Sequence, residues 1–451
     1  MNKKTIITMC IVGITPIMQI NAQNGINSPY SRYAFGVLAD RSMGFNKGMA
    51  GVAQGMRGGQ IINPSNPASY SAVDSLSALF DMGLTLQNGN YKMGYVQQNA
   101  RNTSLDYMAF HFRAFKRVGM AMGILPYSKI NYNMTSGTGH VGGTDDVTTT
   151  YTFTGEGGLH QAFIGVGWQP VRPLSIGVNG SYLFGNYSHT TSMTFSESSI
   201  YSIARGYTSD ITTWTTDFGL QYIQPLGKDR KLTLGFTYGL GHDIKNKAIR
   251  YTQTINASTY ETEGITGDTI HNAFQLPHTF SAGLAYQQGT KLTVGADFEL
   301  QQWSKCKFPT QDNTSGSYIS TTGQLNDKIR ISAGAAYTPD ARSQQFLKHS
   351  TYKIGGFFGQ SYSNADVTGQ LNSKAHEFGV TAGISIPITN RYIWYNNHPR
   401  LNVTVQWTNC NIPYISNVGN SISKHTLKEN YLKLSIGLTF NERWFHKFKM
   451  E

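Results

Sequence analysis

The chain has 451 residues, of which 14% are charged and 12% aromatic, and it contains 48 glycines. Past the N-terminus, no apolar run reaches the roughly 18 residues that a membrane-spanning helix requires, which excludes a helical membrane protein. The formal net charge is +12, but the lysines and arginines are scattered and no recognisable binding motif accompanies them, so we expect no nucleic-acid partner.

Residues 1–23 have the features of a secretory signal peptide. Lys3 and Lys4 form a charged start, Ile6 to Ile20 is mostly apolar, and Asn21-Ala22-Gln23 indicates cleavage near Gln23. Loss of the two lysines lowers the net charge from +12 to +10. We therefore expect export to the periplasm or beyond; a short buried strand or helix is the alternative.

Two cysteines, Cys306 and Cys410, remain in the mature chain, because Cys10 belongs to the signal. A single disulfide between them is one possibility in an oxidising compartment, but two cysteines do not make a disulfide scaffold. We expect both to be structurally incidental.

Residues 24–75 show no alternation of apolar and polar side chains and are rich in small and turn-forming residues, including INPSNPASY from Ile61 to Tyr70. Pro64 and Pro67 cannot donate to a sheet, and glycines at this density oppose a long helix. Because a long series of strands follows, this segment predicts an internal plug, here called the hatch. A flexible periplasmic leader is the alternative.

From residue 76 onward, apolar and polar side chains alternate in long segments. In Thr290–Ser304, even positions from Leu292 to Leu300 are apolar, whereas odd positions from Thr293 to Gln301 are polar or glycine, as in a strand with two unlike faces. About fourteen such segments predict an all-β fold: a transmembrane antiparallel β-barrel over 76–441, with a basic tail at 442–451. A soluble sandwich array is the alternative.

Connection lengths predict the orientation of this barrel. The short turns 225–230 and 287–289 are typical of the periplasmic side, whereas long polar segments are typical of extracellular loops; these lie near 137–157, 186–210, 243–275, 309–326 and 409–429. Aromatic residues at strand ends predict an interfacial girdle, namely Tyr286, Trp303, Tyr337 and Trp407. We expect a monomer in the outer membrane, with lipid and lipopolysaccharide as partners; lipopolysaccharide phosphates or an anionic substrate would suit the positive charge.

Two regions resemble a known family. SMGFNKGMAGVAQGMRGGQIINPSNPASY resembles the hatch of the FadL-like outer-membrane transporters for long-chain fatty acids and other hydrophobic compounds, whose small-residue segment leads into Asn-Pro-Ala. The motif here is Asn66-Pro67-Ala68, preceded by an additional Asn63-Pro64-Ser65. LPHTFSAGLAYQQGTKLTVGADFELQQWS (276–304) is similar to the family's Leu-Pro opening, glycine-bearing strand and Trp-Ser ending, and DKIRISAGAAYTPD (327–340) follows in the expected order.

The resemblance implies passive uptake of a hydrophobic small molecule. In that family the ligand is caught at the extracellular side, enters an apolar lumen pocket blocked by the hatch, and leaves sideways through a gap beside a distorted strand. Gly355-Gly356 is a candidate for such a gap here, although ordinary bending explains this pair equally well.

The predicted lumen contains many glycines, serines and threonines, which leave room for a plug or an elongated ligand, whereas a wide pore more often shows rings of charge. The inward ionisable candidates are His111, Arg113, Asp297, Glu299 and Arg330. We expect them to pair with each other or to hold the hatch; contact of Arg113 or Arg330 with a ligand carboxylate is the alternative.

Catalytic patterns are missing from the sequence, since no nucleophile-elbow, zinc-protease, Walker or Cys-x-x-Cys motif occurs. His242-Asp243 and Asp145-Asp146 fall in predicted loops, where polar residues are ordinary. We predict no enzyme activity, no cofactor and no metal. Two other functions remain open: a barrel that shuttles or anchors exported surface proteins, which predicts a stable protein partner, and a general porin, which predicts steady ion conductance.

Overall fold

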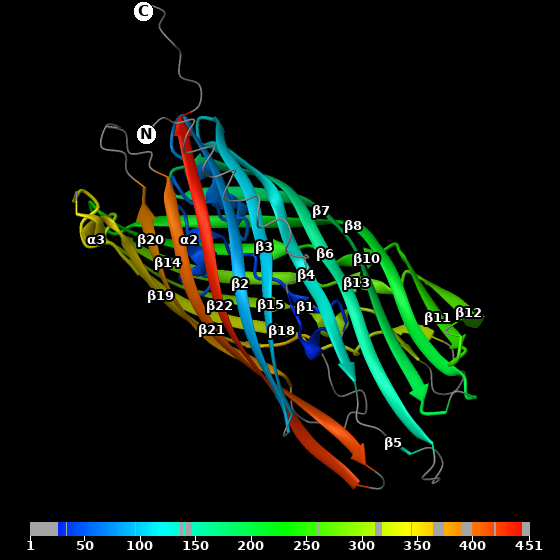
Figure 1. Ribbon diagram of the computed structural model, residues 1–451. Coiled ribbons are helices and arrows are strands. Elements are labelled where there is room, and N and C mark those ends of the chain that lie inside the picture. The colour runs from blue at the N-terminus through cyan, green and yellow to red at the C-terminus, as the bar shows by residue number, and fades with distance from the viewer. Residues whose placement is uncertain are drawn as a thin grey trace, which may run out of the picture.

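The computed structural model describes residues 26–443 except 33, 95, 136–138, 141–146, 198, 260, 312–317, 344, 364–373, 389–398 and 419–420. Within this part of the chain, fourteen antiparallel strands form a closed barrel around residues 26–76, which confirms the predicted fold (Figure 1). No helix among the described residues is long and apolar enough to cross a bilayer. The predicted signal peptide, Asp145-Asp146 and most of the basic tail lie outside the described residues.

The barrel closes where the last strand pairs with the first, and Figure 1 shows β22 beside β2. Each other barrel strand pairs with its predecessor and successor. The fourteen strands are β2 (Ser77–Met93), β3 (Val96–Phe115), β4 (Val118–Thr135), β6 (Thr148–Val171), β7 (Leu174–Phe195), β8 (Ser202–Pro225), β9 (Arg230–Gly239), β14 (Thr279–Gln288), β15 (Leu292–Gln301), β18 (Lys328–Tyr337), β19 (Thr351–Gln360), β20 (His376–Pro387), β21 (Arg400–Val418) and β22 (Ser421–Arg443).

The barrel wall is much taller on one side than on the other. β6, β7 and β8 have 24, 22 and 24 residues, whereas β14, β15 and β18 have 10 each. About 9 to 11 residues suffice to cross a bilayer, so the longer strands continue well beyond it. The predicted loops 186–210 and 409–429 were therefore wrong in large part: these residues belong mostly to the β7–β8 and β21–β22 hairpins. Outside lipid both strand faces are polar, so the alternation ends while the hydrogen-bonded ladder continues.

The two ends of the barrel differ in their connections. At one end, here called the turn end, β3–β4, β6–β7, β8–β9 and β14–β15 are joined by two to four residues. The other end, here called the loop end, carries small additional elements: β5 (Gly139–His140), β10 (His242–Ile244), β11 (Lys247–Ile255), β12 (Thr262–His271), β13 (Phe274–Leu276), η4 (Trp303–Lys305), β16 (Phe308–Gln311) and β17 (Tyr318–Thr321). The short helix α3 (Phe346–His349) lies at the turn end (Figure 1).

Inside the barrel, the hatch forms η2 (Pro29–Arg32), β1 (Val37–Leu38), α2 (Gly44–Lys47) and η3 (Pro67–Ala72). β1 pairs with Lys129 and Ser128 of β4, so the hatch shares backbone hydrogen bonds with the wall. The short elements agree with the dense glycines and the prolines of this segment, which oppose longer ones.

Large apolar side chains on the outer face are exposed in alternation, as expected for contact with lipid; Val294 and Phe298 of β15 are 40% and 42% exposed. Tyr337 and Trp407 are also exposed, in agreement with the predicted girdle. Trp303 is not: it is completely buried, with its ring centroid 4.7 Å from that of Tyr362. The prediction was wrong for Trp303 because β15 ends at Gln301 and the chain then turns inward.

Candidate functional site

The asparagines of the hatch motif build the hatch from within. Asn63 is buried and its Nδ2 donates to the carbonyl oxygens of Ala53 and Met56 at 2.7 and 3.1 Å. Asn66 caps η3, where its Oδ1 accepts from the Ala68 amide at 3.1 Å, and its Nδ2 donates to the Gln54 carbonyl at 2.9 Å. Two asparagines therefore join the stretch around residue 54 to η3.

The same motif touches the wall. The carbonyl oxygen of Pro64 accepts a hydrogen bond from Nδ2 of Asn179 on β7 at 2.9 Å. Pro67 occupies the first position of η3, where its missing N–H costs nothing, and Ala68 is completely buried. The motif residues Asn63, Pro64, Asn66, Pro67 and Ala68 thus position the hatch against β6–β8, and none of them lines the cavity described below.

A track of glycines on the inner wall provides the room for the hatch. A Cβ placed on Gly235 of β9 would lie 1.8 Å from the Gln54 carbonyl oxygen, and one on Gly177 of β7 would lie 2.4 Å from the Pro67 carbonyl carbon. Such distances are impossible for real side chains, so these positions must be glycine for the hatch backbone to approach. Glycines with equivalent hatch contacts are Gly119, Gly167, Gly219, Gly334 and Gly355.

Gly355 and Gly356 do not interrupt the wall. β19 pairs without a register shift with β18 and β20 through both residues. A Cβ on Gly355 would lie 2.5 Å from the Met49 carbonyl carbon, so at least this glycine is needed for hatch packing. This pair is therefore not the gap for which it was a candidate.

Two of the predicted lumen residues hold the hatch directly. Asp297 of β15 accepts hydrogen bonds from the backbone amides of Ala53 and Gln54, the latter at 2.9 Å. Arg330 of β18 donates from Nη2 to the Ala50 carbonyl at 3.3 Å, and its guanidinium lies 4.2 Å from the ring centroid of Phe357. These contacts agree with the hatch-holding role that we expected for inward ions.

The other three candidates lie in different surroundings. Glu299 forms an ion pair with Lys328 at 3.5 Å, although Arg330 is its partner in register on β18. His111 is completely buried, with Nε2 3.1 Å from the Tyr70 carbonyl oxygen of η3. Arg113 does not face the chamber: it donates to Ser75 Oγ at 2.6 Å near the turn end. The structure therefore does not place Arg113 where it would meet a ligand.

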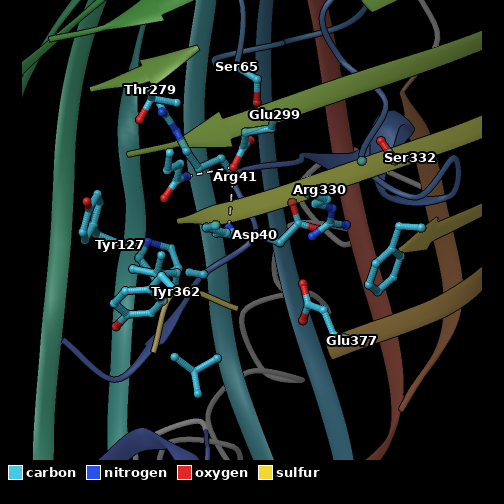
Figure 2. Close-up of a pocket in the computed structure, with 18 of the residues that line it drawn as sticks. Asp40, Arg41, Ser65, Tyr127, Thr279, Glu299, Arg330, Ser332, Tyr362 and Glu377 are labelled. Atoms are coloured by element: carbon cyan, nitrogen blue, oxygen red, sulfur yellow. Dashed lines mark hydrogen bonds and ion pairs between the residues drawn. The ribbon is translucent and has the colours of Figure 1, made fainter. Parts of the chain in front are cut away.

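Between the hatch and the wall lies a cavity of about 280 Å³, here called the chamber. Its lining is strongly charged, with seven carboxylates and six cations from the hatch and from strands on all sides. They are Asp40, Asp106, Asp217, Asp297, Glu299, Glu377 and Glu429, and Arg41, Lys47, Lys129, Lys328, Arg330 and Lys433. Figure 2 shows Asp40, Arg41, Glu299 and Arg330 gathered in one part of this space.

Ion pairs connect the hatch to the wall across the chamber. Arg41 Nη2 lies 2.6 Å from Asp217 Oδ2 of β8. Lys47 Nζ pairs with Asp106 of β3, and Lys129 Nζ of β4 lies 3.9 Å from the same carboxylate. Burial alone would raise the pKa of Asp40, but the charges of Arg330 and Lys47 and the hydrogen bonds from Ser42 hold it below its ordinary value. The hatch carboxylate is therefore ionised in the chamber.

Above the chamber, toward the loop end, the lumen is filled by apolar side chains. Phe35 of the hatch is at the centre, with ring centroids 5.3 Å from Phe274, 5.6 Å from Trp303 and 6.2 Å from Tyr187. The buried cluster also includes Ile130, Leu159, Leu183, Ile211, Ile244, Leu276 and Tyr362. An apolar lumen region exists as the family resemblance implies, but the protein's own residues occupy it.

The barrel wall has a seam beside the chamber. The β3–β4 ladder ends at Met108 and Ile124, although toward the loop end β3 goes on pairing with β2 and β4 with β6. Both strands have a register shift at this level: Asp106 is skipped in the β2–β3 ladder and Tyr127 in the β4–β6 ladder. Both residues line the chamber.

The hatch spans this seam. Asn27 donates from Nδ2 to Asn102 Oδ1 of β3 at 3.1 Å, and its own Oδ1 accepts from Asn131 Nδ2 of β4 at 2.7 Å. β1 pairs with β4 just below. Asn27 therefore bridges the two unpaired strands, and β1 pairs with β4 alone.

Several residues that build this site were not predicted from the sequence. They are isolated charged residues, and nothing in the neighbouring sequence shows that they form ion pairs. The hatch contributes Arg41 and Lys47, and the strands contribute Asp106 and Asp217. Asp106 and Asp217 do occupy inward positions, since neighbouring Leu105 and Phe218 are exposed to lipid. A systematic list of inward charges would have found these two.

The residues that invited an enzyme interpretation have structural contacts. His242 stacks on Trp214 with centroids 4.4 Å apart, and Asp243 forms an exposed ion pair with Lys307 at 3.3 Å. Cys306 and Cys410 are both buried and free. Among the described residues, no group of three or more His, Cys, Asp or Glu side chains is arranged to hold a metal ion.

Comparison with protein-family models gives a match to the model named BamG, which covers residues 1–451. No curated protein matches the chain.

Solved structures of channels and transporters are similar in fold. A monoaromatic hydrocarbon channel, CymD, matches with a TM-score of 0.57 and 13% identity over 91% of this chain and 100% of its own. The toluene transporter TodX of P. putida matches with a TM-score of 0.58 and 13% identity over 90% of this chain and 100% of its own. A FadL homologue of Pseudomonas aeruginosa matches with a TM-score of 0.57 and 13% identity over 91% of this chain and 100% of its own. At this identity the likeness is one of fold, and it confirms the predicted FadL-like barrel architecture.

Proposed function

The chain belongs to the BamG family, and from its FadL-like fold we propose that it serves passive uptake of hydrophobic compounds across the outer membrane. The observation that carries the proposal is the match over the full length of channels named for monoaromatic hydrocarbons and toluene. Fold alone does not fix function, so the route and the ligand are argued from the site.

The route that we propose runs from the loop end into the chamber and then sideways through the β3–β4 seam. The seam supports this route because its two strands are not paired with each other there and both contribute to the chamber lining. The hatch blocks the route: Asn27 and β1 occupy the seam, and α2 lies against the chamber. Uptake therefore requires movement of the hatch, residues 24–75.

The chamber favours a compact amphiphilic compound over a long acyl chain. Its volume of about 280 Å³ is at the lower limit of ordinary ligand pockets, and seven carboxylates and six cations line it. An extended apolar tail would lie against buried charges, which is costly, whereas a small molecule with one polar group would satisfy them. A long-chain fatty acid would in addition need the Phe35 cluster to open.

A second function rests on a different observation. Apolar side chains around Phe35 fill the upper lumen, and strands of 22 to 24 residues form a tall wall at the loop end. A barrel that is closed by its own residues and extends far from the membrane is suited to bind or anchor an exported protein. The charged chamber favours this function, because it needs no apolar path through the lumen.

A disulfide that locks the hatch separates the two functions. A Cβ on Gly48 would lie 3.0 Å from the Lys353 Cβ of β19, so a hatch shift of about 1 Å brings the two Cβ atoms to the roughly 3.8 Å of a disulfide. The double variant Gly48→Cys/Lys353→Cys is made with Cys306→Ser and Cys410→Ser and reconstituted in liposomes. The readout is entry of the hydrophobic dye N-phenyl-1-naphthylamine.

Uptake predicts dye entry through the reduced protein and block on oxidation, with a Cys-free parent insensitive to oxidant. If the reduced protein and the parent admit no dye beyond protein-free liposomes, the uptake proposal fails. Crosslinking in native membranes from loop-end residues would then have to yield a specific protein for the second function to stand.

A further inference from the structure

The rim of the barrel at the turn end repeats one pattern. A large exposed apolar side chain is followed within one to four residues by a cation in turns from distant parts of the chain. The pairs are Phe115 (73% exposed) with Lys116, Val171 (50%) with Arg172, Leu226 (52%) with Lys228 and Arg230, and Leu347 (65%) with Lys348.

The charge at this rim is strongly one-sided. Among the described residues, seven exposed cations lie there, with four half-buried ones behind them, against four exposed carboxylates. The exposed cations are Lys116, Arg172, Lys228, Arg230, Lys291, Arg342 and Lys348; the half-buried ones are Arg113, Arg117, Lys231 and Arg400; the carboxylates are Asp74, Asp229, Asp340 and Glu442. Eleven cations minus four carboxylates leave +7 for the described residues of this rim.

Among the described residues, the cations of the rim make no close contact with carboxylates, and Asp74 acts on Arg113 and Arg400 only from beyond ion-pair distance. None of the eleven forms an ion pair in the described part of the chain. At the loop end, by contrast, carboxylates accompany the cations: Glu197, Glu263 and Asp268 are exposed there alongside Arg205, Lys245 and Lys247. The positive charge therefore belongs to the end opposite to the one that lipopolysaccharide would contact, because short turns are periplasmic in such barrels.

We propose that this rim binds the anionic headgroups of phospholipids in the periplasmic leaflet. The short turns and the β18–β19 connection (338–350) hold their cations at the depth of the lipid phosphates, with which guanidinium and ammonium groups pair well. The adjacent exposed apolar side chains enter the upper acyl region, as is usual at a membrane interface.

The distribution of the pattern favours lipid over a protein partner. It occurs on turns from β3–β4 to β18–β19, which lie on opposite sides of the barrel according to the strand order. Lipid surrounds a barrel on every side, whereas a docked protein covers one sector. The rim thus resembles the clusters of lysine and arginine beside the membrane through which other membrane proteins bind anionic lipids.

The test compares the full chain in vesicles of phosphatidylcholine alone with vesicles containing about a third phosphatidylglycerol. The readout is the unfolding temperature, from the heat-dependent shift in gel mobility. The rim variant is Lys116→Gln/Arg172→Gln/Lys228→Gln/Arg230→Gln. The matched control, Arg205→Gln/Lys245→Gln/Lys247→Gln/Lys305→Gln, removes the same charge from the loop end.

Wild type and control are expected to gain about 5 °C from phosphatidylglycerol, and the rim variant to lose at least about half of that gain. High salt should abolish the difference because the headgroups are solvent-exposed. A rim variant that keeps the whole gain, or a wild type with none, overturns the proposal. The rim is assigned to a protein partner instead if the wild type shows no gain from phosphatidylglycerol but retains an acidic protein from native membranes, and if the rim variant does not retain that protein.

Discussion

Arg41 in the hatch donates a hydrogen bond from Nη2 to Asp217 Oδ2 on β8 at 2.6 Å, across 176 residues of sequence. Asp217 is the partner that neutralises this guanidinium inside the barrel, where side-chain exposures are 31% for Arg41 and 14% for Asp217. The barrel ladder does not depend on this contact, since β8 pairs with β7 and β9 through backbone groups. Hatch attachment and barrel stability can therefore be perturbed separately.

We predict that Asp217→Asn loosens the hatch while the barrel remains folded. The neutral side chain leaves Arg41 without its carboxylate, at a cost of about 1–3 kcal/mol for a hydrogen bond to a charged group. Hydrogen exchange of residues 26–76 measures the effect, compared with exchange of the β14–β15 amides. Asp243→Asn, which breaks the exposed pair with Lys307, is the control and should change little. Equal hatch protection in wild type and Asp217→Asn would contradict the prediction.

Gly235→Ala is expected to expel part of the hatch. Its Cβ would lie 1.8 Å from the Gln54 carbonyl oxygen, so the hatch backbone must move, at a cost on the order of 1–3 kcal/mol for overpacking. Limited proteolysis should cut the hatch of the variant faster than that of the wild type. Gly180→Ala on β7 is the matched control, because its Cβ would meet nothing within 4 Å. Identical cleavage of the two variants would show that the hatch does not depend on the close approach at Gly235.

Acid should release the contribution of Asp40. Because its pKa in the folded protein is below the ordinary 3.8, its stabilisation is complete above that value and is lost as the pH falls through the lowered pKa. The difference in unfolding free energy between wild type and Asp40→Asn should be constant at neutral and mildly acidic pH and shrink in strong acid. Asp340→Asn, at the exposed turn end, is the control. A difference that grows as the pH falls would reverse the sign and exclude this electrostatic account.

Phe35→Ala should open the upper lumen. Removing a completely buried phenylalanine that contacts Phe274, Trp303 and Tyr187 costs about 3–5 kcal/mol where the site cannot collapse. Single-channel recording in planar bilayers should show conductance events that the wild type lacks. Phe358→Ala, 55% exposed on the outer face, keeps the lumen intact and serves as the control. If both variants stay silent, the Phe35 cluster does not seal the lumen.

Alternation was enough to find the fourteen strands within lipid, because a bilayer imposes opposite polarity on the two faces of every strand. It failed at the β7–β8 and β21–β22 hairpins, where water bathes both faces. It also failed at Trp303, which follows a strand yet turns inward. In each of these cases the rest of the fold decides whether a side chain meets lipid, water or the lumen, and the local pattern of residues does not show it.

The hatch motif was visible as Asn63 and Asn66, but its role was not, since their partners Ala53, Gln54 and Met56 come from another turn of the same segment. The inward positions of Asp297 and Arg330 followed from strand register. Their ligands, the Ala53 and Ala50 backbone groups, depend on how the hatch is folded inside the barrel.

Local features of the sequence are enough to predict a barrel with a small-residue plug, because the period of alternation, the glycine content and the turn lengths are local quantities. Tertiary structure alone decided which charges meet, where the wall loses its ladder and which end carries the positive rim. Those features join residues such as Arg41 and Asp217, or Phe115 and Leu347, that only barrel closure brings to the same end or the same space. The spacing of residues along the chain does not predict these features, because the way the barrel closes depends on the geometry of all fourteen strands together.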